Sequence, residues 1–347
     1  MTSMITSNKW YARSNRESDV VVSSRIRLAR NVADLPFPRK MSAADRQELA
    51  ARTERALEKG KFTGSLAFSR VDMGKLSEEQ AAALVERHSV SPDFANDRAG
   101  KALFVSADES VGIMVGEEDH LRIQVLSANL DLNDCMELAD RIDDLLDEEM
   151  HFAFDEKLGY LTQCPTNLGT GLRASVMLHL PVLEMTGAIG RLVGTVSKLG
   201  LALRGTFGEG SEARGALYQL SNQVTLGISE EAAIANLTGI ASQLIEQERK
   251  ARAAAGREPA LADRVWRAYG VLRYCRSVSM DEYMQYMSLV RLGAGLGMFD
   301  GLSVTSLDAL TCTVGAGNLM ATAGKALTPG ERDAERAARV RTALENA

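Results

Sequence analysis

The sequence predicts an α+β fold, in which a mainly antiparallel sheet flanked by helices is followed by a small helical domain. Short apolar runs at 102–106, 111–115 and 121–127 are separated by polar or glycine-containing turns, which is the pattern of an antiparallel meander. An earlier stretch, 19–30, alternates its side chains with the period of two that is typical of a strand. After about residue 229 helical patterns dominate, so the rest of the chain is expected to be helical.

The strand expected at 19–30 has two chemically different faces. Ile26 and Leu28 point to one side and Arg25 and Arg27 to the other, because side chains alternate across a strand. The two arginines are therefore expected to share one face of the sheet.

Helical spacing of apolar residues predicts the elements that follow. The first helix is expected at 41–59, with Ser42 as its N-cap. The helix at 133–149 repeats apolar residues from Cys135 to Leu145 at helical spacing. Further helices are expected at 77–88 and 182–200. Further strands are expected at 158–162, 174–180 and 216–226.

The C-terminal third has no strand pattern. Its helices are expected at 229–255, 260–275, 279–292, 305–310 and 329–345. The best candidate for a linker is 249–259, which combines charged residues, alanines and a Gly and Pro that stop a helix. The sequence thus predicts two domains, 1–255 and 256–347.

Composition excludes several classes of protein. Of the 347 residues, 45% are hydrophobic and 25% charged, as in an ordinary globular protein, which excludes disordered and collagen-like chains. The net charge of −6 argues against a dedicated nucleic-acid binder. No apolar run reaches the roughly 18 residues of a membrane span, and no signal segment is seen. We therefore expect a cytoplasmic protein without nucleic-acid or membrane partners, whose four cysteines are reduced.

The distribution of arginine is the first feature that points to chemistry. The candidates are Arg25, Arg27, Arg122, Arg173 and Arg204. Arginine holds phosphate oxygens bidentately with a planar, permanently charged fork. Several arginines that converge on one sheet would bind a triphosphate, although the chain has no P-loop motif. The alternative is five unconnected surface charges.

Acidic residues and one cysteine are the second feature. Glu117, Glu118 and Asp119 are adjacent carboxylates that repel one another unless a cation or a function offsets them, or else they form a solvated turn. Glu209 lies between glycines in a loop that either closes over a site or is an ordinary surface loop. Cys164 precedes a proline and a glycine-rich turn, and a buried structural thiol is the alternative to a reactive one. The four histidines have no metal-ligand spacing, so no protein metal site is expected.

Three blocks of sequence together resemble the guanidino (phosphagen) kinase superfamily, which includes arginine and creatine kinases. The longest is Cys-Pro-Thr-Asn-Leu-Gly-Thr-Gly-Leu-Arg-Ala-Ser at 164–175. Glu-Glu-Asp-His-Leu-Arg at 117–122 and Arg-Gly-Thr-Phe-Gly-Glu at 204–209 follow the family's order, and the match covers about 20–230. One departure is Gly116, where the family usually has Asn.

Within this superfamily the chain looks most like the bacterial protein-arginine kinases. The block at 23–31 stands almost at the start of the chain, whereas a helical domain precedes it in metabolite kinases. The segment 204–213 fits the protein-kinase form of the family's mobile loop. Arg-Asp-Ala-Glu-Arg-Ala at 332–337 matches the RDxxRA pattern of a phosphoarginine receptor site, although a solvated charged helix would look similar.

The resemblance implies transfer of the γ-phosphoryl group of ATP to a guanidinium nitrogen of arginine, with Mg²⁺ carried on the nucleotide. Glu118 would be the base and guanidinium clamp, Glu209 a second carboxylate and Cys164 an orienting thiolate. The implied nucleotide-binding residues are Ser24, Arg25, Arg27, His120, Arg122, Arg173 and Arg204. The implied phosphoarginine receptor consists of Arg332, Asp333, Arg336 and Ala337.

The implied substrates are proteins with exposed arginines, marked for a stress response or for degradation. The resemblance also implies a homodimer, an activator protein and a Clp-type unfoldase or protease as partners. Two alternatives remain at this stage: a small-molecule arginine kinase, and a non-catalytic adaptor that binds phosphoarginine.

Overall fold

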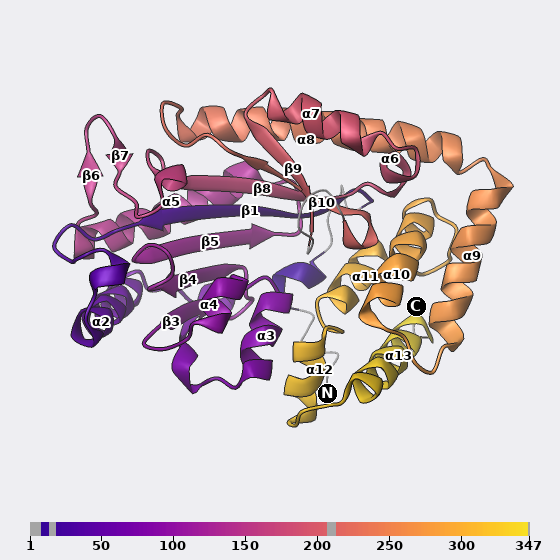
Figure 1. Ribbon diagram of the computed structural model, residues 1–347, viewed down its shortest axis with the longest axis horizontal. Coiled ribbons are helices and arrows are strands. Elements are labelled where there is room, and N and C mark those ends of the chain that lie inside the picture. The colour runs from indigo at the N-terminus through magenta and orange to yellow at the C-terminus, as the bar shows by residue number, and fades with distance from the viewer. Residues whose placement is uncertain (1–7, 14–18, 207–212, 346–347) are drawn as a thin grey trace.

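An eight-stranded sheet forms the centre of the computed structural model, which describes residues 8–13, 19–206 and 213–345 (Figure 1). The strand order is β2-β3-β4-β5-β1-β8-β10-β9, and every neighbouring pair is antiparallel. The strands are β1 (Val21–Arg30), β2 (Phe68–Asp72), β3 (Ala102–Ser106), β4 (Val111–Val115), β5 (Leu121–Ser127), β8 (Leu172–His179), β9 (Leu201–Gly205) and β10 (Leu217–Asn222). A separate hairpin pairs β6 (Phe154–Asp155) with β7 (Gly159–Tyr160). The predicted antiparallel sheet and its meander are confirmed.

Helices pack on both faces of this sheet. Their bounds are α2 (Ala43–Lys59), α3 (Glu78–Glu86), α4 (Pro92–Asn96), α5 (Leu132–Met150), α6 (Pro181–Met185), α7 (Ile189–Ser197) and α8 (Glu230–Ala255). On one face α2, α5 and α8 share a core with Ile26 and Leu28 of β1, both fully buried. On the other face α3 and α4 pack over Leu103 and Met114 of the meander. That second face carries Arg25 and Arg27, as the alternation along β1 predicts.

The predicted start of the first long helix is confirmed. Ser42 accepts a hydrogen bond from the backbone of Asp45, and the Asp45 carboxylate accepts one from the backbone of Ser42. This capping box satisfies amide groups that have no partner within the first turn of α2.

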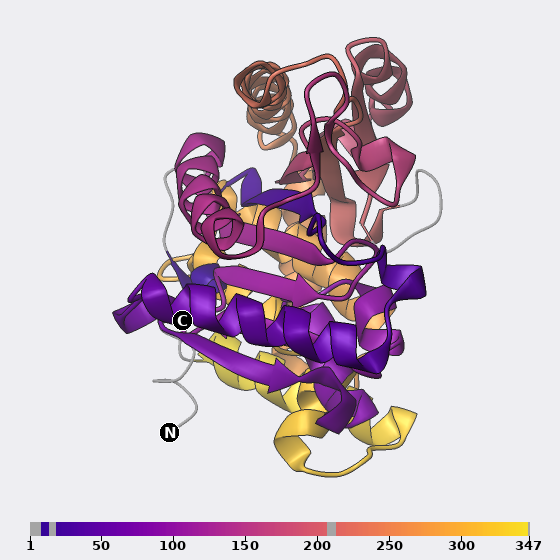
Figure 2. The same cartoon turned by 90° about the vertical axis from the view of Figure 1, so that its left-hand side faces the viewer.

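The C-terminal helices gather at one end of the sheet, as the orange and yellow ribbons show in Figure 1 and, after a 90° turn, in Figure 2. They are α9 (Pro259–Tyr274), α10 (Met280–Gly295), α11 (Val304–Thr311), α12 (Ala316–Ala323) and α13 (Pro329–Glu345). They have a hydrophobic cluster of their own, in which Leu272, Tyr283, Val290 and Val340 are fully buried. The division into 1–255 and 256–347 stays a prediction.

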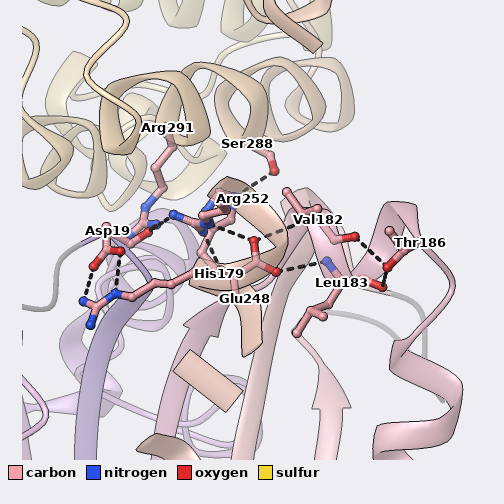
Figure 3. Close-up of polar contacts among 10 residues, drawn as sticks. Asp19, His179, Val182, Leu183, Thr186, Glu248, Arg252, Ser288 and Arg291 are labelled. Carbon is pink, nitrogen blue, oxygen red and sulfur yellow. Dashed lines mark hydrogen bonds and ion pairs between the residues drawn. The ribbon is translucent and has the colours of Figure 1, made fainter. Parts of the chain in front are cut away.

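A buried polar network fastens these helices to the sheet (Figure 3). Arg252 of α8 and Arg291 of α10 both donate to the backbone carbonyl of Asp19, just before β1. Arg252 Nη2 also donates to the carbonyl of His179 at the end of β8 (2.8 Å), and His179 Nε2 lies 2.9 Å from Ser288 Oγ of α10. We call this group, together with Glu248 and Asp308, the junction network. It ties α8 and α10 to the ends of the two strands that carry Arg25, Arg27 and Arg173.

Two predictions of where helices are interrupted are wrong. The helix expected at 182–200 is broken into α6 and α7, because Gly187 has a positive φ of 69° that a helix does not contain. The linker expected at 249–259 is mostly helix, since α8 continues to Ala255 and α9 begins at Pro259. Buried contacts of Arg252 hold this stretch in place, which its charged composition does not reveal.

Short elements escaped the sequence analysis. Neither β2, β9 nor α12 was predicted, and the strand expected at 158–162 is only the two-residue β7. Length alone is not the reason, because β3 and β4 also have five residues and match their predicted ranges; β2 has no buried residue, so its apolar pattern is weak. In the described part of the chain, no helix is both long and apolar enough to cross a membrane.

Candidate active site

Five arginines converge on the face of the sheet opposite Ile26 and Leu28. They come from β1, β5, β8 and β9, and we call them the arginine cluster: Arg25, Arg27, Arg122, Arg173 and Arg204. The registers of the sheet explain their proximity, because Arg27 is directly opposite Arg173, and Ala29 is directly opposite Arg122. The sequence prediction that these residues share a site is therefore consistent with the geometry.

The arginine cluster is electrostatically unfavourable by itself. Burial and the positive charges of Arg122 and Arg173 lower the pKa of Arg25 to about 10. Burial first, and then Arg25 and the other arginines, hold the pKa of Arg27 well below its ordinary value. Among the described residues, no carboxylate forms an ion pair with Arg25, Arg27, Arg173 or Arg204, and the buried Nε of Arg27 has no hydrogen-bond partner. Such a cluster attracts anions strongly.

Neutral side chains position Arg25. Its Nη2 donates to Gln219 Oε1 of β10 (2.7 Å), and its Nε to Ser175 Oγ of β8 (3.4 Å). His88 also lies near, since burial and the charge of Arg25 lower the pKa of its imidazole to about 4. The sequence does not mark these three residues as part of a site, because a lone Gln, Ser or His carries no motif and only the sheet register and one turn bring them here.

A cavity of about 310 Å³ opens beside the arginine cluster. Its lining includes Arg27, Arg122, Arg173, Glu118 and Cys164. Two of the predicted catalytic residues therefore face the same small space as three of the predicted phosphate-binding arginines. A cavity of this size, with few and convergent polar groups, is typical of a small-ligand site.

The three adjacent carboxylates after β4 separate into different environments. Glu117 accepts from Arg122 Nη1 at 2.5 Å and from Ser91 Oγ at 2.9 Å. Glu118 lies 3.5 Å from Arg122 Nη2 and keeps 43% of its side chain exposed. Asp119 turns inward and is only 2% exposed. Arg122 is thus a cation that offsets two of these carboxylates, and only Glu118 is held loosely at the cavity.

The backbone conformation at Gly116 explains why a glycine fits this position. Its φ of +80° lies in the left-handed region, and its N–H donates to the carbonyl of His120 at 2.8 Å to close the turn. Glycine adopts this conformation freely and asparagine is among the few other residues that tolerate it. Replacement of the family's usual Asn by Gly is therefore compatible with the same turn.

Glycines of the 164–175 block allow a tightly packed loop between Cys164 and Arg173. A side chain on Gly169 would come within 2.2 Å of the carbonyl oxygen of Thr225, and one on Gly171 within 2.6 Å of that of Ala29. Both positions also have positive φ. Cys164 itself is partly exposed, with its Sγ 3.1 Å from Thr166 Oγ1. The block therefore serves to bring the thiol and Arg173 to one cavity.

Two of the predicted nucleotide-binding residues point away from the site. Ser24 lies two residues before Ile26 on β1, so its side chain points to the same face of the sheet, under α2, α5 and α8, where it is fully buried. His120 is also fully buried: its Nδ1 accepts from the N–H of Val32 (2.9 Å), and its Nε2 contacts the carbonyl of Pro36 (2.8 Å). Both ring nitrogens of His120 are occupied, so neither Ser24 nor His120 offers its side chain to a nucleotide.

One predicted catalytic residue, Glu209, lies outside the described residues. The predicted phosphoarginine receptor lies on α13. Arg336 is 2% exposed and donates to the carbonyls of Val278 and Val314 and to Asp333. Ala337 is fully buried in the C-terminal cluster, which corrects its prediction as a ligand contact.

A larger cavity of about 760 Å³ separates the C-terminal helices from the sheet. Its lining includes Arg336, Met284, Arg291, His88 and Ser23. It therefore extends from the predicted receptor on α13 to the end of β1 that carries Arg25.

Two protein-family models match this chain. The family described as ATP:guanido phosphotransferase, C-terminal catalytic domain, matches residues 48–251, which is more than half of the chain. The family described as Protein-arginine kinase McsB C-terminal domain matches residues 258–347.

Curated relatives are similar over nearly their whole length. Protein-arginine kinase of Caldanaerobacter subterraneus subsp. tengcongensis is 46% identical over 94% of this chain and 98% of its own. Protein-arginine kinase of Geobacillus kaustophilus is 45% identical over 96% of this chain and 93% of its own.

Solved structures share the fold at lower identity. Lombricine kinase is 26% identical with a TM-score of 0.60, covering 72% of this chain and 71% of its own. The duplicated taurocyamine kinase of Schistosoma mansoni, with bound transition state analog components, is 27% identical with a TM-score of 0.61, covering 72% of this chain and 37% of its own.

Proposed function

The chain belongs to the ATP:guanido phosphotransferase family and, within it, to the protein-arginine kinases; we propose that the arginine cluster and the cavity beside it form its active site. The enzyme is an ATP-dependent phosphotransferase that acts on arginine side chains of proteins. The observation that carries the assignment of the site is that Glu118 and Cys164 share one cavity with Arg27, Arg122 and Arg173.

The reaction has to overcome the chemistry of guanidinium. This group is cationic and has no free lone pair, and its pKa exceeds about 12. In our proposal Glu118 holds the guanidinium of the substrate and accepts its proton as the N–P bond forms, while the bond between the γ-phosphorus and the bridging oxygen breaks and ADP leaves. Partial exposure and the long contact with Arg122 leave the Glu118 carboxylate able to do both. Glu209 would be the second carboxylate, and Cys164 would orient the guanidinium as a thiolate.

The arginine cluster would bind the triphosphate. Its guanidinium groups supply bidentate donors to phosphate oxygens and neutralise the charge that spreads over the transferring group. Mutual repulsion within the cluster falls when a polyanion binds, so the same charges that destabilise the empty site favour the nucleotide.

Mg²⁺ would arrive with the nucleotide rather than in a protein cage. Among the described residues, no group of three His, Cys, Asp or Glu side chains is arranged to hold a metal. That fits Mg²⁺, which keeps waters and is usually held by substrate phosphates with one or two carboxylates. Glu117, which pairs with Arg122 of the arginine cluster, would be such a carboxylate. When bound, the ion neutralises charge on the β- and γ-phosphates.

The wider biological setting is part of the same proposal. Resemblance to the family supports a cytoplasmic enzyme that marks proteins for a stress response or degradation. A homodimer, an activator protein and a Clp-type unfoldase or protease are the partners it supports. Arg332, Asp333 and Arg336 would receive phosphoarginine, with Arg336 lining the larger cavity, and would couple its binding to activity.

The proposed site is tested by changing Glu118 to Gln. The substitution preserves size but removes the negative charge, so kcat for an unfolded protein substrate is expected to fall at least about a hundredfold. ATP affinity should stay nearly unchanged, because the arginine cluster is intact. Phosphoarginine is measured by mass spectrometry at neutral pH, since acid cleaves the P–N bond.

Glu137→Gln provides the control, because Glu137 is an exposed carboxylate on α5. It should leave kcat at the wild-type value. Weaker ATP binding with an unchanged kcat in Glu118→Gln would contradict the role of Glu118. Phosphorylation of free arginine in place of protein would favour a small-molecule kinase.

A further inference from the structure

Asp119 is the residue of the acidic turn that the proposed reaction does not use. It follows Glu118 directly, yet only 2% of it is exposed, whereas the Glu118 side chain keeps 43% of its surface. Consecutive residues of the turn therefore face opposite ways: Glu118 faces the cavity and Asp119 faces the protein.

Three N–H groups converge on the Asp119 carboxylate. Oδ1 accepts from the side-chain amide of Asn31 and from the backbone N–H of Gln163, each at 2.7 Å. Oδ2 accepts from the side-chain amide of Asn167 at 3.5 Å. Gln163 is the residue before Cys164, and Asn167 lines the same cavity as Cys164. One carboxylate thus grips the Cys164 segment on both sides of the thiol.

Asn31 closes this arrangement from the end of β1. Its Oδ1 accepts from the backbone N–H of His120 at 2.9 Å, while its Nδ2 donates to Asp119 and to the carbonyl of Leu161 (3.0 Å). Asn31 is 1% exposed. The end of β1, the Glu118 turn and the Cys164 segment are therefore joined through two buried side chains, which we call the Asp119–Asn31 pair.

We propose that Asp119 is a positioning residue that fixes the spacing between Glu118 and Cys164. This rests on the proposed function, in which these two residues hold the substrate guanidinium from different chain segments. Glu118 and Cys164 belong to the β4–β5 turn and to the loop before β8, which are far apart in sequence. Within the described residues, the Asp119–Asn31 pair is the direct side-chain bridge between these two segments.

A carboxylate suits this role better than an amide. All three partners are N–H donors, and an ionised carboxylate only accepts. An asparagine at 119 would present one amide group as a donor towards donors, so at least one N–H would lose its partner in a buried place. The expected consequence is a shift of the Cys164 segment relative to Glu118. A displacement of about 1 Å at a reacting centre can cost about a hundredfold in rate.

The test is Asp119→Asn in the full-length enzyme, with two measurements. The first is steady-state kinetics with an unfolded protein substrate, where kcat should fall at least about tenfold and KM for ATP should change less than about twofold. The second is alkylation of Cys164 by iodoacetamide, followed by mass spectrometry of its peptide. In the wild type, ADP, Mg²⁺ and an arginine-containing peptide should slow alkylation, and in the variant this protection should be largely lost.

Asp108→Asn is the matched control. Asp108 is 1% exposed and accepts from Ser106 and Ser110 at the opposite end of β4. Its substitution removes an equally buried carboxylate, so the melting temperature should fall while kcat and the protection of Cys164 stay at wild-type values. If Asp119→Asn does not fold, Asn31→Ala removes one donor and should shift both measurements in the same direction.

The outcomes separate this inference from the proposed function. Wild-type kcat and Cys164 protection in Asp119→Asn, with Glu118→Gln inactive, would overturn the positioning role alone. An active Glu118→Gln would overturn the proposed function itself. A lower melting temperature with unchanged kinetics and protection would leave Asp119 as a fold-stabilising residue only.

Discussion

Two groups of arginines meet the same sheet, and they differ in what surrounds them. Arg252 and Arg291, on two helices, are almost fully buried, whereas the arginine cluster on the strands is half-buried, with Arg204 exposed. In the junction network, Arg252 pairs with Glu248 at 2.8 Å and Arg291 pairs with Asp308 at 2.7 Å. In the arginine cluster, Arg27 and Arg173 are directly opposite each other, and neither has an acidic partner among the described residues. The first group is neutralised by the protein, whereas in the second, within the described residues, Arg122 alone has carboxylate partners.

The difference separates a structural role from a binding role. Burying a charge is costly unless it is paired, so the junction network holds α8 and α10 on the sheet only because each arginine has its carboxylate. In the arginine cluster the unfavourable free energy of holding like charges close together is not offset by carboxylates of the described residues, and binding of an anion would offset it. Burial of an arginine alone therefore does not indicate a ligand site, whereas half-buried arginines without an acidic partner, such as Arg27 and Arg173, favour one.

The largest expected effect is the loss of activity in Arg27→Met. Methionine fills much of the volume of the arginine but cannot hold a phosphate, so kcat/KM should fall about a thousandfold, as for arginines that stabilise transferring phosphoryl groups. The stability of Arg27→Met should not fall along with its activity. Removing one of several repelling charges should leave the free energy of unfolding without nucleotide unchanged or higher, measured by urea denaturation.

The stabilisation that ATP gives on binding provides a second test of the role of Arg27. At a concentration of 100 times Kd it should stabilise the wild type by about 2.7 kcal/mol and the Arg27→Met variant much less. A variant that is clearly less stable than the wild type without nucleotide would mean that Arg27 is a structural arginine like those of the junction network.

The opposite response is expected from Arg252→Met. This substitution leaves Glu248 buried without its partner, and breaking a buried pair typically costs about 3 kcal/mol. Glu248 would still accept from the backbone N–H groups of Val182 and Leu183, at 3.2 and 3.0 Å, which limits the loss. Urea denaturation should show the lower stability, while kcat of the folded fraction stays close to that of the wild type.

Replacing both partners tests the pairing itself. A Glu248→Met, Arg252→Met double variant should recover part of the lost stability, because no unpaired charge remains. Double-variant stability equal to the sum of two separate losses would show that Arg252 acts mainly through the carbonyls of Asp19 and His179 instead of through Glu248.

The shared face of Arg25 and Arg27 could be predicted because the alternation of side chains along a strand is a local rule, whereas the register that brings Arg173 opposite Arg27 is not. Alternation along 19–30 placed Arg25 and Arg27 on one face, and the family blocks supplied Arg122, Arg173 and Arg204. The same periodicity, applied to Ser24, would have shown that it points to the core with Ile26. Its inclusion as a nucleotide-binding residue came from the resemblance and not from the pattern of the strand.

Other features depend on contacts that no local pattern contains. The inward turn of Asp119 follows from donors on Asn31 and Gln163, which come from distant segments. The buried position of His120 follows from the backbone of Val32 and Pro36. The charged stretch after Glu248 looked like a linker, but tertiary pairing of Arg252 keeps it helical. A charged residue in the sequence does not show whether the folded protein places an oppositely charged residue beside it.

The smallest expected effect concerns Arg336, which is intermediate between the two groups of arginines. Its Nε and Nη1 are held by the carbonyls of Val314 and Val278 and by Asp333, at 3.0, 2.8 and 2.6 Å. In the described part of the chain its Nη2 has no hydrogen bond, and the residue lines the larger cavity. Removing Arg336 would therefore disturb the packing of α13 as well as any receptor.

Arg332→Ala is the cleaner test of the proposed receptor, because Arg332 is only half-buried and lies one helical turn from Arg336. Loss of one charge-assisted contact should weaken binding of free phosphoarginine about tenfold in calorimetry. Progress curves of the kinase should show a change in the effect of phosphoarginine on the rate, and the coupling free energy behind that effect is typically about 1–3 kcal/mol. Arg267→Ala on the exposed face of α9 is the control and should change neither measurement. Unchanged binding and unchanged progress curves in Arg332→Ala would show that Arg332 takes no part in a receptor on α13, because a guanidinium that grips phosphoarginine cannot be removed without loss of affinity.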